Sequence, residues 1–161
     1  QGLGSARYRV VPRTLVFVRH DARLLLIRRS ADRKIWPGKV NGIGGHVEAG
    51  EGFVASARRE VLEESGLHVD NLRLVGLLHV TDSAVDEGVL VLVLTADAIS
   101  DDVTASTEGE LIWVRPDTAL SLDLVPDLRQ ILPRLWPSDQ AGVFVAVSTG
   151  TPGQQLTFVE A

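Results

Sequence analysis

Hydrophobic and polar positions follow one another along the first third of the chain in the manner of two strands and a loop. β-branched and other apolar residues dominate residues 8–18 and 24–29, and the polar turn His20-Asp21-Ala22 separates them. Apolar runs bounded by turn residues are typical of strands, so we expect a hairpin here. Residues 30–45, which include Pro37-Gly38 and several further glycines, predict a loop.

Residues 53–66 have the clearest helical pattern. Val54, Ala57 and Val61 recur at spacings of three and four, which predicts an apolar stripe that faces the core. Gly66 follows at the position where helices often end in a left-handed residue. We therefore expect this helix to dock through one face and to stop at Gly66.

The middle of the chain predicts three more strands. Apolar runs cover residues 72–80, 89–95 and 111–114. The acidic stretch 82–87 joins the first two of these runs.

A second helix and a closing hairpin are predicted towards the end of the chain. Pro126 opens the helix, and Pro133 must kink it or end it early. One face of this helix carries Leu128, Ile131, Leu132 and Leu135. Residues 143–147 and 156–159, with a turn at 150–153, predict the hairpin.

These elements predict an α/β fold of packed layers, because one or two helices accompany many strands. The strict alternation of strand and helix that defines a doubly wound Rossmann sheet is missing. With 161 residues and no internal repeat, residues 1–161 are expected to form a single domain. The Gln1-Gly2 start and the lack of methionine indicate that residues 1–5 come partly from a cloning or protease site.

Composition and charge exclude several functions. The chain has no cysteine, which removes thiol nucleophiles, thiolate metal sites and disulfides. A net charge of −5 disfavours binding to nucleic acid, which needs clustered Lys and Arg. The sequence has no apolar stretch of the ~18 residues that a membrane helix needs and no signal-peptide pattern, so we expect a cytoplasmic protein without membrane association.

Three acidic residues of the first helix stand out chemically. Glu60, Glu63 and Glu64 share a sector of about 100°, and like charges at this spacing destabilise a helix by about 0.2–0.5 kcal/mol. One interpretation is a solvated acidic face. The other is a site for Mg²⁺ or Mn²⁺, since hard oxygen ligands suit these ions.

The segment around these carboxylates resembles the Nudix box of the Nudix hydrolase family. Its defining positions are all filled, in the order Gly45, five residues, Glu51, seven residues, Arg59-Glu60-Val61, one residue, Glu63-Glu64, one residue, Gly66-Leu67. Residues 41–47 and Val125-Pro126-Asp127 look similar to the oxidised-purine nucleoside triphosphatase branch. Val125 and Leu128 depart from that branch, which has a tryptophan and a second aspartate that help to grip the base, so the resemblance leaves the preferred base open.

The resemblance implies an α/β/α sandwich with a central mixed sheet, and Mg²⁺-dependent hydrolysis of a nucleoside diphosphate linked to another group, with Mn²⁺ as a substitute. The implied metal ligands are Glu60, Glu63, Glu64, Glu108 and the carbonyl of Gly44. Glu51 would pair with Arg59 and orient the carboxylates. Arg29 resembles a phosphate-binding arginine, and Asn41 and Asp127 resemble residues that read the edge of the base.

The expected reaction is attack by water on phosphorus, with Glu60 or Glu108 as the general base. Several of these residues also have a plain structural interpretation. Arg29 can be a solvated charge at a strand end, Asn41 a turn residue, and Asp127 an acid that favours the first turn of a helix. Trp113 is expected in the core, and His46 is expected to be a partly exposed structural residue.

Among the substrates that the resemblance implies, we expect a nucleoside triphosphate, oxidised or normal, cleaved to monophosphate and pyrophosphate, as in sanitation of the nucleotide pool. ADP-ribose, nucleotide sugars and dinucleotides are alternatives. Outside catalysis, the alternatives are a nucleotide-sensing domain and a structural Ca²⁺ protein, although the EF-hand spacing is absent. The expected partner is a small nucleotide, and the sequence leaves monomer and homodimer open.

Overall fold

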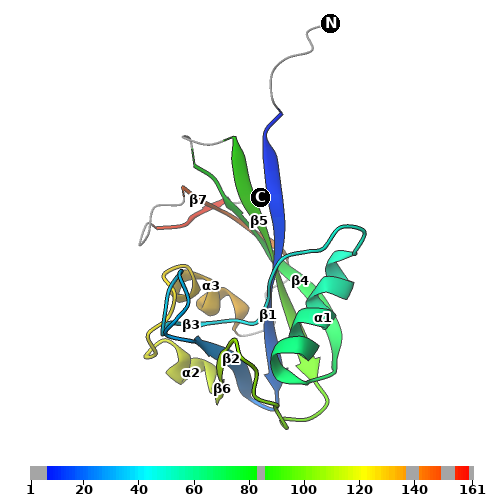
Figure 1. Ribbon diagram of the computed structural model, residues 1–161. Coiled ribbons are helices and arrows are strands. Elements are labelled where there is room, and N and C mark those ends of the chain that lie inside the picture. Colours follow the sequence, from blue (N-terminus) through cyan, green and yellow to red (C-terminus); the bar gives the residue numbers. More distant parts are fainter. Residues whose placement is uncertain (1–6, 83–85, 137–141, 150–154, 160–161) are drawn as a thin grey trace, which may run out of the picture.

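A computed structural model of the chain describes residues 7–82, 86–136, 142–149 and 155–159. Within these residues, eight strands form one mixed sheet with helices on both faces (Figure 1). The strands are β1 (Arg9–His20), β2 (Arg23–Arg29), β3 (Val40–Asn41), β4 (Val69–Val80), β5 (Glu87–Ala98), β6 (Gly109–Val114), β7 (Phe144–Ser148) and β8 (Thr157–Val159). The helices are α1 (Phe53–Ser65), α2 (Pro116–Ala119) and α3 (Leu128–Leu135). The predicted α/β sandwich with a central mixed sheet is confirmed.

The sheet has the order β3-β2-β1-β5-β4-β7-β8, and β6 pairs with β2. The predicted first hairpin is present, with Val18 opposite Leu25 in antiparallel register and Asp21 at φ 52 in the turn. Strand β1 runs parallel to β5 on its other side, and β4 runs parallel to β7. Long β1 therefore joins the hairpin half of the sheet to the half that contains β4 and β5.

The two faces of the sheet carry separate hydrophobic cores, because successive residues of a strand point to opposite faces. Val16 and Val18 lie in the core that includes Ala57 and Val61 of α1. Phe17, between them, lies in the core that includes the apolar face of α3. All four residues predicted for that face of α3 are buried, namely Leu128, Ile131, Leu132 and Leu135.

Several predicted boundaries and positions need correction. Val54 is 50% exposed, since the first three residues of α1 are exposed and its buried residues begin at Ser56. Helix α3 begins after Asp127, not at Pro126, and continues past Pro133 to Leu135. The predicted turn at 150–153 lies outside the described residues.

Two short elements were not predicted, β3 and α2. Strand β3 has two residues and pairs with β2 at Asn41 opposite Ile27. It is also held by a distant segment, since the Val40 N–H donates to the Asp123 carbonyl (2.8 Å) and the Val125 N–H donates to the Val40 carbonyl (2.9 Å). Such a contact leaves no periodicity in the local sequence.

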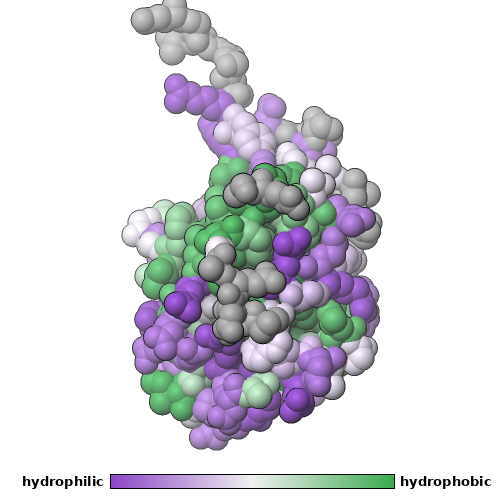
Figure 2. All heavy atoms as spheres, turned by 180° about the vertical axis from the view of Figure 1, so that it is seen from behind, coloured by the Kyte–Doolittle hydropathy of each residue, from purple (hydrophilic) through white to green (hydrophobic). Residues whose placement is uncertain are grey.

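The upper ends of β1, β4, β5 and β7 extend beyond the helices in Figure 1. Seen from behind, hydrophobic residues gather in the upper middle of the molecule with hydrophilic residues around them (Figure 2). In the described part of the chain, no helix is long and apolar enough to cross a membrane.

Replacing Gly66 by alanine is expected to destabilise the fold. Gly66 caps α1 at φ 73, and a Cβ there would lie 2.8 Å from the Thr104 hydroxyl oxygen. The left-handed conformation alone costs about 1–2 kcal/mol for an L-residue, and the contact adds to it. The measurement is urea unfolding, with Gly50→Ala as the control, because Gly50 is at φ 81 but has open space around its Cβ position. Equal losses in the two variants would contradict a role for the Thr104 contact.

Candidate active site

A glycine loop lies flat against β1 just before α1. The Thr14 N–H donates to the Gly45 carbonyl (2.9 Å), and the Val47 N–H donates to the Pro12 carbonyl (3.1 Å). Gly44 is at φ 153, and a Cβ there would lie 2.0 Å from the Thr14 carbonyl oxygen. Only glycine permits this approach, so the sequence of the loop fixes how closely it packs on the strand.

The next glycine brings the loop up to the first carboxylate of α1. A Cβ on Gly45 would lie 2.5 Å from Oε1 of Glu60. The Glu60 side chain is 13% exposed and therefore lies over the loop rather than in solvent. Because Gly45, the first residue of the box, has no side chain, there is room for the Glu60 carboxylate.

Arg59 holds several of the acids in place. It donates two hydrogen bonds to Glu51, at 2.9 and 3.1 Å, in a fork-shaped contact. It also donates to Glu60 at 2.9 Å and to Glu63 at 3.1 Å. The Arg59 guanidinium lowers the pKa of Glu51 to about 2, and Glu51 in turn raises the pKa of Arg59. The ion pair expected between Glu51 and Arg59 is formed.

Glu64 is the buried acid of the site, with 8% of its surface exposed. The pKa of Glu64 is raised to about 8, first by burial and then by the neighbouring negative charges of Glu60 and Glu108. The Gly44 N–H, as a hydrogen-bond donor, and the charge of Arg29 act in the opposite direction. Glu60, one helical turn away, and Glu108, which is distant in sequence, therefore both lie within electrostatic range of Glu64.

Glu63 stands apart from this cluster. Its side chain is 60% exposed, and its partner among the described residues is Arg59. Glu108 lies in the loop before β6 and is bound by Arg33 from the loop after β2. In their present positions, no three acidic or histidine side chains of the described residues form a closed metal cage. Glu60 and Glu108 would have to exchange arginine contacts for a cation.

The donor set nevertheless fits a divalent cation. The buried Glu64 faces two further carboxylates, and the repulsion between them is a local excess of negative charge. Carboxylate oxygens are hard ligands that Mg²⁺ and Mn²⁺ prefer. A cation at this point would relieve the repulsion that raises the pKa of Glu64.

Two arginines lie within electrostatic range of the carboxylates. Arg29, at the end of β2, donates from Nε to the Ile35 carbonyl at 3.0 Å and lies within electrostatic range of Glu64. Arg13, on β1, lies close enough to Arg29 and Glu60 to be affected by both charges. Nothing in the sequence distinguishes Arg13, because a charged residue in an alternating strand looks like an ordinary solvent-facing position.

The two proposed base-reading residues lie on segments that the structure brings together. Asn41 follows Val40, and Val40 is hydrogen-bonded to the segment that leads to Asp127. The Asn41 side-chain oxygen accepts from the Gly42 N–H at 2.9 Å. Asp127 precedes α3 without a side-chain cap, and burial raises its pKa. Val125 and Leu128, which depart from the branch pattern, are buried in the core on this side.

Trp113 and His46 both lie nearer the surface than expected. Trp113 is partly buried and packs against the core that includes Ala57 and Val61, while its ring N–H donates to the Asp101 carbonyl (3.1 Å). Arg23 lies over its ring, 5.5 Å from the centroid. His46 is exposed, and its backbone carbonyl, rather than its ring, accepts a hydrogen bond from Arg59 (3.1 Å).

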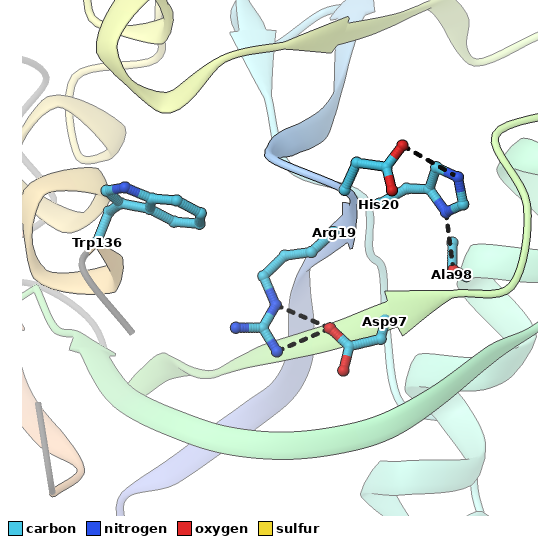
Figure 3. A pocket seen from close by; sticks show the side chains of 6 residues that line it. Arg19, His20, Asp97, Ala98 and Trp136 are labelled. Atoms are coloured by element: carbon cyan, nitrogen blue, oxygen red, sulfur yellow. Dashed lines mark hydrogen bonds and ion pairs between the residues drawn. The ribbon is translucent and has the colours of Figure 1, made fainter. Parts of the chain in front are cut away.

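A separate hollow of about 450 Å³ is lined by Arg19, His20, Asp21, Asp97, Ala98 and Trp136 (Figure 3). Arg19 points to Asp97, with an ion pair of 2.8 Å, and the Trp136 ring lies across the hollow. The His20 ring contacts the Ala98 carbonyl at 3.0 Å. Because these polar groups already have partners, we place the active site at the carboxylate cluster instead.

This fold and this site define a Nudix hydrolase. Residues 9–135 match the NUDIX domain, so the chain belongs to that family and acts on pyrophosphate bonds. Over 114 residues it is 38% identical to the oxidized purine nucleoside triphosphate hydrolase of Mus musculus, covering 71% of this chain and 72% of that protein. It is also 38% identical over 100 residues to the Danio rerio protein of the same name, covering 62% and 63%.

Solved structures support the fold. The mutator MutT protein from Bacillus halodurans superposes with a TM-score of 0.78 at 21% identity and covers 92% of this chain and 97% of its own. The MutT protein from Methanosarcina mazei superposes with a TM-score of 0.69 at 23% identity, covering 84% and 99%. At these identities the likeness concerns the fold alone.

Without metal, the stability of the protein is expected to fall as the pH rises from about 5 to about 8. The pKa of Glu64 is about 8 in the folded chain against an ordinary value of 4.5, so the folded state binds more protons in this range. Each pKa unit corresponds to about 1.4 kcal/mol, which gives an effect of a few kcal/mol. Urea unfolding in EDTA across this pH range measures it.

Glu64→Gln is expected to remove most of this dependence and to be more stable than the parent protein at the upper end of the pH range. The control is Glu63→Gln, because Glu63 is 60% exposed. A Glu64→Gln variant with the same pH slope as the parent would contradict the assignment.

Proposed function

We propose that the protein is a nucleoside triphosphate pyrophosphohydrolase, with oxidised purine nucleotides among its substrates, which releases a monophosphate and pyrophosphate. The observation that carries the hydrolytic part is the convergence of Glu60, Glu64 and Glu108 beside Arg29. The carboxylates that would hold a metal ion therefore lie within range of an arginine that would bind phosphate. The substrate class is supported by the 38% identity to the oxidized purine nucleoside triphosphate hydrolase of Mus musculus.

The residues that would hold Mg²⁺ or Mn²⁺ are Glu60, Glu64 and Glu108, with Glu63 and the Gly44 carbonyl completing the set. When bound, the cation would neutralise the phosphates and lower the pKa of a water ligand. Arg59 keeps Glu60 and Glu63 beside the loop through its hydrogen bonds. Glu51 fixes Arg59 in turn, so it acts on the site through another residue.

Hydrolysis then needs a positioned water and a base. The water oxygen forms a bond to one phosphorus while the anhydride oxygen leaves with the pyrophosphate, and the water proton passes to a carboxylate. Glu60 and Glu108, which both face Glu64, are the two candidates for the base. Arg29 would hold a phosphate group through its free guanidinium nitrogens.

The nucleobase of the substrate would bind near Asn41 and Asp127. Both side chains are partly buried and carry hydrogen-bonding groups, so they can discriminate between bases by pairing or failing to pair. The hydroxyl of Thr14 is buried, at 3% residue exposure, and has no hydrogen-bond partner among the described residues. A ligand that enters beside β1 would supply one.

A kinetic screen tests the substrate class. Oxidised and normal dNTPs, ADP-ribose, nucleotide sugars and dinucleoside polyphosphates are compared by kcat/KM with Mg²⁺ present. We expect the triphosphates to be the best substrates and Glu64→Gln to lower kcat by orders of magnitude. Glu48→Gln is the control, because Glu48 is an exposed acid of the same loop. A best substrate without a triphosphate would overturn the proposed class and leave the hydrolase assignment intact.

Changes at the base-binding residues are expected to alter selectivity. Asn41→Ala and Asp127→Ala should reduce the ratio of kcat/KM between oxidised and normal dGTP about tenfold or more, as expected when a buried polar contact of 1–3 kcal/mol is lost. The hydrolysis of a poor substrate should change much less. Uniform losses on every nucleotide, or no change at all, would contradict base reading by these residues.

A further inference from the structure

Arg13 is a partly buried cation without a side-chain partner. Within the described residues the Arg13 side chain makes no hydrogen bond, ion pair or ring contact. Every other partly buried arginine there has at least one such contact, and these arginines are Arg19, Arg23, Arg28, Arg29, Arg33 and Arg59. A charge that is shielded from water and left unpaired costs stability, so its retention points to a ligand.

The backbone fixes Arg13 at the edge of the glycine loop. Arg13 lies opposite His46 in an isolated antiparallel bridge. The residues on either side of it hydrogen-bond to the loop, Pro12 to Val47 at 3.1 Å and Thr14 to Gly45 at 2.9 Å. The start of its side chain is therefore held next to the box, independently of the side chain's own contacts.

Arg13 lies within electrostatic range of Arg29 and Glu60. Burial lowers the pKa of Arg13, Arg29 lowers it further, and Glu60 opposes both. Two guanidinium groups from different strands thus act electrostatically on each other, and Glu60 of the carboxylate cluster acts on Arg13 as well. Glu60 already accepts a hydrogen bond from Arg59 at 2.9 Å, so Arg13 is not required to neutralise it.

We propose that Arg13 binds a phosphate group of the substrate together with Arg29, next to the pyrophosphate bond that is cleaved. A guanidinium group matches phosphate oxygens with two parallel hydrogen bonds. An anion between Arg13 and Arg29 converts their repulsion into two attractions. The inference needs only hydrolysis of pyrophosphate bonds and does not depend on which nucleotide is the substrate.

The test compares Arg13→Gln, Arg13→Lys and Arg9→Gln. Arg9 is the control because it is an exposed arginine of the same strand. The readouts are Mg²⁺-dependent kcat/KM on the best substrate of the screen, and calorimetric binding of inorganic pyrophosphate with Mg²⁺. We expect Arg13→Gln to weaken both about 10- to 100-fold, as for the loss of a charge-assisted hydrogen bond. Arg13→Lys should retain part of the affinity, and Arg9→Gln should match the parent protein.

Thermal unfolding separates this role from a structural one. Because the charge of Arg13 is unpaired, Arg13→Gln should keep or raise the Tm of the protein without ligand, while pyrophosphate should raise its Tm less than that of the parent. Pyrophosphate binding of parental strength in Arg13→Gln overturns the proposal, whatever its Tm. A change of preferred nucleotide in the screen, with pyrophosphate binding still dependent on Arg13, would overturn only the proposed substrate class.

Discussion

The repulsion between carboxylates around the buried Glu64 is the constraint on which the rest of the site depends. Burial and two neighbouring acids raise the pKa of Glu64 to about 8, although folding would be easier with an apolar residue there. The fold therefore holds Glu64 where the charged form of its carboxylate is disfavoured. Such strained electrostatics are typical of functional sites, because a bound cation reverses the sign of the interaction.

The surrounding structure holds this charge cluster in place by two different means. Gly44 and Gly45 allow the loop to approach β1 and Glu60 more closely than any other residue would, which fixes the loop by sterics. Arg59 connects the loop to the helix by polar contacts to Glu51 and to the His46 carbonyl. The carboxylates are therefore positioned by parts of the chain that would not themselves touch a substrate.

The arrangement of positive charge follows from the sheet. Strands β1 and β2 are adjacent and antiparallel, and they carry Arg13 and Arg29, whose charges act on Glu60 and Glu64 of the cluster. A chain with a net charge of −5 thus concentrates cations at one place. This local arrangement, rather than the overall charge, decides which ligand the surface can attract.

The sequence by itself determined the box, helix α1, the first hairpin and the mixed α/β class, because periodicity and glycine positions are local properties of the chain. It did not distinguish Glu63 from Glu64, which are neighbours in sequence but 60% exposed and 8% exposed in the fold. The approach of Glu108 to Glu64, the pairing of β3 with the segment before α3, and the unpaired charge of Arg13 were decided only by the tertiary structure. Each of these depends on contacts between distant segments, which leave no pattern in the residues on either side.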